Sequence, residues 1–173
     1  AVTVSNLPIA AGSISGPSNV CQNESNLVFS VAPVAYASSY VWIYPAGFTV
    51  SGSATGSSIT LNSSAGAVPG IIRVRGVNAC GNGSFSPDFS ILISSSPAAN
   101  AGINAGICPG STYQLSGATA SNYSSLLWTS SGDGSFDNSL GLNPTYTPGS
   151  NDLSTGSTVL TLTANGNGSC SPA

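Results

Sequence analysis

The stretch GIIRVRGVNACGNGSFSPDFSILIS, residues 70–94, decides the fold of this chain. On both sides of a central Gly-Asn-Gly turn, apolar residues alternate with arginine or serine. Alternation with a period of two is typical of a half-buried β-strand, so the pattern predicts strands at residues 71–77 and 89–93. Arg73 and Arg75 alternate with apolar neighbours in the first of them, and we expect both on one solvent-facing side.

Similar short stretches recur through the rest of the chain, each bounded by Gly, Pro, Asn or Ser. They predict further strands at residues 27–31, 40–44, 48–50, 59–61, 113–115, 126–129, 144–146 and 159–163. No segment has convincing helical spacing. Short strands with turn signals at such intervals predict an all-β chain of antiparallel β-sandwiches.

The strands fall into two similar halves. We expect two tandem Ig-like or PKD-like sandwiches, at residues 9–96 and 97–173. Each half holds one tryptophan, Trp42 or Trp128, at a similar distance after a cysteine, and each is expected to fill the core of its sandwich. The second half shows no final strand after its last predicted one, so we expect a strand of the next repeat to complete it.

The even number of cysteines predicts disulfides, because metal binding through cysteine usually needs two of them two to four residues apart. The four are Cys21, Cys80, Cys108 and Cys170. We expect one bond within each half, Cys21 with Cys80 and Cys108 with Cys170. Closing loops of about 60 residues would stabilise each half by roughly 4 kcal/mol. Disulfides indicate an oxidising compartment outside the cytoplasm.

Charged residues are scarce, with two Lys or Arg, five Asp or Glu and no His among 173 residues. A nucleic-acid-binding face is therefore excluded, and no apolar run is long enough to span a membrane. Without histidine or lysine no serine has an evident general base, so we do not expect an enzyme. No cofactor is expected, with a weak calcium site at Asp133, Asp137 and Asp152 as the alternative to simple turn chemistry.

The two ends of the chain, read tail to head, repeat a pattern found in its middle. Residues 80–108 contain Ser-Pro, an alternating apolar run and a Gly/Ala-rich segment before a cysteine, and residues 170–173 followed by 1–21 contain the same. The apolar run at the junction consists of Val2, Val4 and Leu7. We therefore expect one unit of a repeat, in which residues 1–8 form the strand that completes the second sandwich of a neighbouring unit.

Two assemblies fit this expectation. In a covalent array, residues 1–8 follow the preceding repeat in the same polypeptide. Alternatively, separate subunits exchange this strand as donor-strand pilins do, because an unpaired strand groove exposes apolar side chains and backbone polar groups. In both, the partners are other copies joined head to tail, and the low charge allows lateral bundling.

Several motifs resemble a known type of repeat. GPSNVC (16–21), YVWIYPAGF (40–48) and IIRVRGVNACGNGSFSP (71–87) resemble PKD-like or Ig-like repeats in surface proteins of Bacteroidota. Residues 98–170 resemble the companion repeat of the same large proteins, including the giant gliding-motility adhesins. The resemblance implies a cell-surface protein exported by the type IX secretion system, with many modules in series and an export signal outside this sequence.

We expect a structural repeat unit of an extracellular filament or adhesin stalk, which provides reach, stiffness and surface attachment. The alternatives are a donor-strand-exchanged subunit and a module that binds surface polysaccharide. The second alternative would use exposed aromatic residues among Tyr36, Tyr40, Tyr44, Tyr113, Tyr123 and Tyr146.

Overall fold

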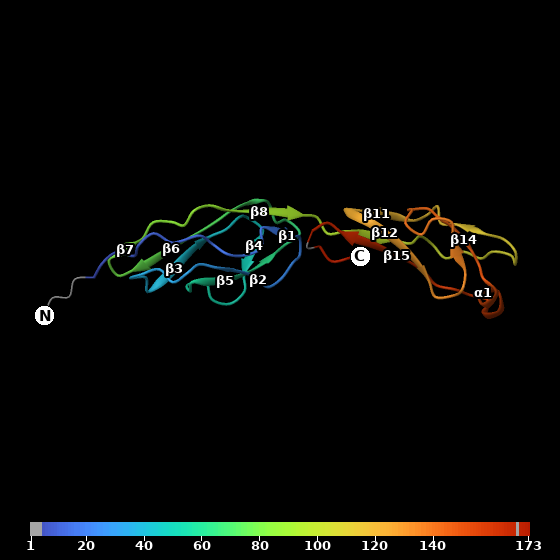
Figure 1. Ribbon diagram of the computed structural model, residues 1–173, viewed down its shortest axis with the longest axis horizontal. Coiled ribbons are helices and arrows are strands. Elements are labelled where there is room, and N and C mark those ends of the chain that lie inside the picture. Colours follow the sequence, from blue (N-terminus) through green and yellow to red (C-terminus); the bar gives the residue numbers. More distant parts are fainter. Residues whose placement is uncertain (1–4, 169) are drawn as a thin grey trace. The chain divides into compact units, whose positions relative to one another are not determined.

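The computed structural model describes residues 5–168 and 170–173, so the predicted assembly residues Val2 and Val4 lie outside the described residues. The chain divides into two compact units, Ala1–Ser95 and Ser96–Ala173, called unit 1 and unit 2 below. Both consist of β-strands, and the described residues contain a single helix of six residues (Figure 1). The expected all-β fold is confirmed.

Unit 1 is a sandwich of two β-sheets. Its strands are β1 (Asn19–Cys21), β2 (Leu27–Ser30), β3 (Ser39–Ile43), β4 (Phe48–Val50), β5 (Ser58–Ser63), β6 (Gly70–Asn78), β7 (Gly81–Asn82) and β8 (Phe89–Ser94). One sheet has the order β1-β8-β6-β3, with β7 paired to β6, and the other has the order β2-β5-β4. The pair of β1 and β8 is parallel, whereas β6 pairs antiparallel with both β3 and β8.

Alternation along β6 decides which side chains enter the core of unit 1. Ile72 and Val74 of this strand are fully buried. They belong to one apolar cluster with buried residues of both sheets, among them Phe29, Trp42, Ile59, Leu61 and Ile91. Full burial of a side chain of this size contributes about 1.5–3 kcal/mol, so the cluster is the main stabilising element of the unit.

The two arginines of β6 alternate with these core residues. The Arg73 guanidinium donates two hydrogen bonds to the Asp88 carboxylate, from Nε at 2.5 Å and from Nη2 at 2.9 Å. This bonding holds the pKa of Asp88 below its usual value, although both side chains are about half exposed. The guanidinium carbon of Arg75 lies 4.7 Å from the centre of the Phe85 ring, in a cation–π contact.

Unit 2 is built from smaller sheets. Its elements are β9 (Ala98–Asn100), β10 (Tyr113–Gln114), β11 (Thr119–Ser121), β12 (Tyr123–Ser130), β13 (Ser135–Phe136), β14 (Thr145–Thr147), α1 (Ser150–Thr155) and β15 (Leu160–Gly166). The pairings are β12-β15, β11-β9 and β10-β14-β13. Its core cluster surrounds Trp128, which is 2% exposed, with Leu126, Leu162 and Ala164 buried beside it.

The helix α1 was not expected from the sequence, because its six residues carry no apolar period. Its formation depends on a contact across unit 2: the backbone N–H groups of Asn151 and Asp152 donate to the Asp133 carboxylate. The helix ends at Gly156, whose φ of 75° is a left-handed conformation that glycine adopts without strain. Within residues 5–168 and 170–173, no helix is long and apolar enough to cross a membrane.

The predicted pairing of cysteines within each half is wrong. Cys21 and Cys170 are disulfide-bonded cysteines, whereas Cys80 and Cys108 are exposed free thiols. In unit 1 the reason is strand geometry. Cys21 pairs with Ser94, beyond the Gly70 end of β6, whereas Cys80 follows its other end. A strand as long as β6 spans about 30 Å, and bonded cysteines have Cα atoms within about 7 Å.

The same geometry separates the cysteines of unit 2. Cys108 lines a pocket together with Leu160, the first residue of β15. Cys170 follows the other end of that strand, where its N–H donates to the carbonyl oxygen of Asn167 at 3.2 Å. The two thiols of each expected pair therefore lie at opposite ends of a long strand.

Candidate assembly site in unit 2

Strand β15 has an open edge. On one side it pairs with β12, where Trp128 lies opposite Leu162. On the other side, Ala164 and Ala173 exchange two backbone hydrogen bonds of 2.8 and 3.0 Å. Because successive residues of a strand direct their backbone groups to alternate sides, Leu162 and Leu160 direct theirs to the same side as Ala164. No other strand in the described part of the chain pairs with that side.

The corresponding edge in unit 1 is covered. There β6 pairs with β3 on one side and with β8 on the other, and β8 pairs in turn with β1. Val20 of β1 lies opposite Ile93 and is fully buried. In unit 2, residues 104–108 end in a cysteine as β1 does, but they form no strand and Ile107 is 42% exposed. The place that β8 fills in unit 1 therefore corresponds to the open side of β15 in unit 2.

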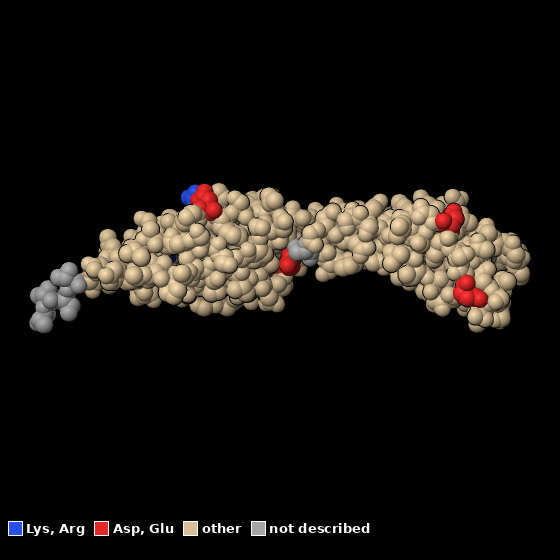
Figure 2. Space-filling view, viewed as in Figure 1, with Lys and Arg blue, Asp and Glu red and all other residues tan. Residues whose placement is uncertain are grey.

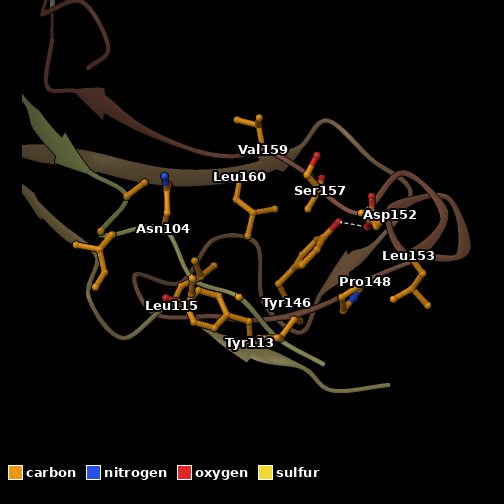
Figure 3. Close-up of a pocket in the computed structure, with 18 of the residues that line it drawn as sticks. Asn104, Tyr113, Leu115, Tyr146, Pro148, Asp152, Leu153, Ser157, Val159 and Leu160 are labelled. Atoms are coloured by element: carbon orange, nitrogen blue, oxygen red, sulfur yellow. Dashed lines mark hydrogen bonds between the residues drawn. The ribbon is translucent and has the colours of Figure 1, made fainter. Parts of the chain in front are cut away.

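A pocket of about 590 Å³ lies beside the open edge (Figure 3). Its lining includes Ile103, Ile107, Tyr113, Leu115, Tyr146 and Leu160. In Figure 3, the side chains of Leu160, Leu115 and Tyr146 converge on the same space. Ile103 is 85% exposed, and Val159, which also lines the pocket, is 65% exposed. Apolar side chains next to unpaired backbone groups are what an added strand covers.

The polar groups at the floor of this pocket are already satisfied. The Tyr146 hydroxyl, on a side chain that is 2% exposed, donates to Oδ2 of Asp152 at 2.6 Å. The backbone N–H of Gly149 donates to the same oxygen at 3.1 Å. The bond from Tyr146 is the main reason that the pKa of Asp152 lies below its usual value. The carboxylate of Asp152 is therefore engaged within unit 2, and the lining of the pocket combines polar and apolar side chains.

The three carboxylates considered for calcium accept hydrogen bonds from protein groups. Besides Asp152, Asp133 accepts from the N–H of Asn151 at 3.1 Å, and Asp137 accepts from the N–H of Thr145 at 2.8 Å. These backbone bonds are the main cause of the lowered pKa of Asp133 and of Asp137. Among the described residues, no group of three or more His, Cys, Asp or Glu could hold a metal ion. Their observed role is to fix turns and the start of α1.

The tyrosines considered for polysaccharide binding differ widely in exposure. Tyr36 is 57% exposed and has a φ of 66°, and Tyr123 is 39% exposed. Tyr146 is buried, and Tyr40 accepts a backbone hydrogen bond through its hydroxyl. Tyr113 and Tyr146 line the pocket beside β15, so the most exposed tyrosines are not the ones at the pocket.

The first described residues of the chain lie against the β6–β7 turn of unit 1. The side-chain amide of Asn78 donates to the carbonyl oxygen of Asn6 at 2.7 Å. The Cys80 thiol donates to the carbonyl oxygen of Ser5 at 3.2 Å. Leu7, which was expected to contribute to assembly, remains 54% exposed. Ser5 therefore lies beside a free thiol.

Comparison with known protein families identifies a match in unit 1. Residues 7–91 match the model of the PKD-like domain family, and comparison with curated proteins gave no match. The matched range begins in the N-terminal segment that lies beside Cys80 and ends within β8. It includes strands of both sheets of the sandwich. The expected resemblance to a PKD-like domain is thus confirmed for this part of the chain, and unit 1 has the β-sandwich fold of PKD-like and Ig-like domains.

Proposed function

We propose that this chain is a structural repeat unit of an extracellular filament or cell-surface adhesin stalk, and that copies join head to tail through residues 1–8. The observation that carries the proposal is the open side of β15 beside a pocket with exposed apolar side chains, at the position where unit 1 has a strand. A strand with alternating apolar residues would pair with the backbone of Leu160 and Leu162 and cover the exposed side chains.

The hydrogen bonds of Ala173 supply a register for the added strand. The reciprocal bonds with Ala164 are those of an antiparallel pair. If Ala1 follows the Ala173 of a preceding copy, continuation of this register places Val2 opposite Leu162 and Val4 opposite Leu160. Residues directly opposite each other have side chains on one face, so both valines would point to the face of the buried Leu162.

Other observations support an extracellular structural role. PKD-like domains generally serve as extracellular structural and adhesive modules and are typically not catalytic. The presence of disulfide-bonded cysteines fits an oxidising compartment. The resemblance to Bacteroidota surface repeats supports type IX export and a place in a gliding-type adhesin. In Figure 2 the visible surface carries few charged side chains, which favours lateral packing without repulsion.

Substitutions on the two faces of the added strand test the proposal. The assembly of the full chain would be measured by light scattering and electron microscopy. We expect head-to-tail oligomers that are lost when Val2→Asp and Val4→Asp are combined, because both charges would enter the apolar site. Thr3→Asp is the matched control, since Thr3 lies on the opposite face of the strand. Equal assembly of the double variant and the control would contradict the proposal.

The mass of native surface material distinguishes the two arrangements. After boiling in SDS with reductant, separate subunits would run at 17.0 kDa. A much larger product, with a proteolytic peptide that spans Ala173 and Ala1, would show a continuous array. In both cases the same residues fill the open side of β15.

A further inference from the structure

The two sheets of unit 1 turn different faces outward. On the sheet β2-β5-β4, Thr60 and Asn62 of β5 alternate with buried residues and therefore face outward. The sheet that contains β3, β6 and β8 instead turns apolar side chains outward, each 40–61% exposed. These side chains, called the apolar face below, are Val41, Ile43, Ile71 and Leu92.

The apolar face is continuous across three neighbouring strands. Strand β6 lies between β3 and β8, with Arg73 opposite Ile43 and Ile71 opposite Ser90. Ile71 is therefore a diagonal neighbour of both Ile43 and Leu92, with Cα atoms about 7–8 Å apart. A strand that faces water on one side normally alternates apolar and polar residues, whereas a strand covered on both sides has a continuous apolar run. Strand β8 contains such a run, Ile-Leu-Ile at residues 91–93.

The charges on this side of the sheet allow it to approach a copy of itself. The two arginines of the chain, Arg73 and Arg75, alternate with core residues of β6 and share the side of Ile71. The charge of Arg73 is compensated by its hydrogen bonds with Asp88. Arg75 lies further along β6, with its guanidinium over the Phe85 ring. If two faces meet with antiparallel β6 strands and Ile71 at the centre, the two Arg75 residues stand about 26 Å apart, beyond the Debye length of about 8 Å.

We propose that the apolar face of unit 1 packs against the same face of a second copy, with Ile71 at the centre and the two β6 strands antiparallel. This is an isologous contact, in which one surface serves both partners. Two sheets that pack in this way lie about 10 Å apart, and their outward side chains interdigitate.

The exposed area favours a repeated copy as the partner. The four apolar side chains expose on the order of 350 Å², whereas each partner of a stable complex buries about 800 Å². A single pair is therefore weak, with a dissociation constant on the order of 1 mM. Copies in series repeat the same contact, and linked weak contacts together bind far more tightly than one alone. This last step rests on the proposed function, and it makes the apolar face the contact that bundles filaments side by side.

Concentration-dependent NMR spectra test the pairing. The sample is the full chain with Val2→Asp and Val4→Asp, so that assembly through residues 1–8 does not contribute. Over concentrations that span about 1 mM, we expect amide shifts to change in β3, β6 and β8 and to stay constant in β2, β4 and β5. Sedimentation equilibrium of the same samples should show a monomer and a dimer. Spectra and mass that do not change with concentration would overturn the proposal, as would shift changes on the other sheet.

A matched pair of variants tests which face forms the contact. Leu92→Thr and Val28→Thr each replace an exposed apolar residue of unit 1, at 61% and 52% exposure, but on different sheets. Threonine retains a high β-propensity, so both variants should keep the fold. Leu92→Thr should weaken the dimer at least about tenfold, because the side chain is buried twice in a two-fold contact, and Val28→Thr should leave it unchanged. Equal weakening by the two variants would contradict the proposal.

The outcomes separate this inference from the proposed function. In the unmodified chain, Ile43→Thr combined with Leu92→Thr should leave head-to-tail filaments intact and remove their bundles in electron micrographs. Bundles that persist in this variant would overturn the pairing and leave the filament proposal standing. If the unmodified chain forms no filaments, the proposed function fails, and the dimer measured by NMR still decides the pairing.

Discussion

Units 1 and 2 differ most at one strand position. In unit 1, β8 lies between β6 and β1, and Val20 of β1 is fully buried. In unit 2, the bonds of Ala173 are the only backbone bonds from the described residues on the matching side of β15, and Ile107, the counterpart of Val20, is 42% exposed. The comparison indicates that a short segment such as β1 becomes a strand when its neighbour is present. If residues 1–8 of another copy supply this neighbour, residues 104–108 should become regular in the assembly.

Truncation of one isoleucine in each unit should give the largest contrast. Ile91→Ala removes a side chain of β8 that is 1% exposed, and we expect unit 1 to lose about 2–5 kcal/mol. Ile107→Ala in unit 2 should change the stability of the unassembled chain by under about 0.5 kcal/mol, because the side chain has few neighbours to lose. Denaturant unfolding, with hydrogen exchange read separately in β6 and β15, would measure both. Equal losses in the two units would show that unit 2 is already complete.

A peptide of residues 1–8 supplied in trans should stabilise one unit selectively. If it fills the open side of β15, unit 2 should gain about 2.7 kcal/mol at a peptide concentration of 100 Kd, whereas unit 1 should gain nothing. Hydrogen exchange of β15 and β6 in the same sample would measure the two units. A peptide with aspartate at positions 2 and 4 is the control and should have no effect. Protection of β6 that equals the protection of β15 would contradict selective filling.

The sequence predicts both long and short strands where apolar residues alternate. Alternation located β6 and β4 because their apolar residues face a core, and it located β15 only in part. It missed β1, which depends on pairing with β8, and α1, which depends on Asp133. The predicted cysteine pairing failed because it was based on the number of residues between the cysteines. That number does not indicate at which end of a strand each cysteine lies. The tail-to-head match in the sequence predicts that unit 2 lacks a strand, but the open edge of β15 and the pocket beside it required coordinates.

Acid should weaken unit 2 before unit 1. The pKa values of Asp133 and Asp152 lie below their usual value of 3.8. A carboxylate with a lowered folded-state pKa stabilises the fold above the unfolded pKa, and this stabilisation is lost as the pH falls through the folded-state value. Unit 2 should therefore lose stability progressively below about pH 4. Hydrogen exchange of β15 between pH 6 and pH 2.5 would measure the loss. Asp152→Asn should reduce this pH dependence while it weakens the unit at neutral pH.

The smallest effect should come from the ion pair of unit 1. Asp88 also has a lowered pKa, because of its hydrogen bonds with Arg73, but the two side chains are 47% and 45% exposed. Water and salt screen an exposed pair, whereas Asp152 is 6% exposed and bonded to a buried tyrosine. Asp88→Asn should therefore change the unfolding midpoint of unit 1 much less than Asp152→Asn changes that of unit 2. Thermal unfolding in low and high salt would compare them, and an equal shift for the two variants would mean that burial does not set the difference.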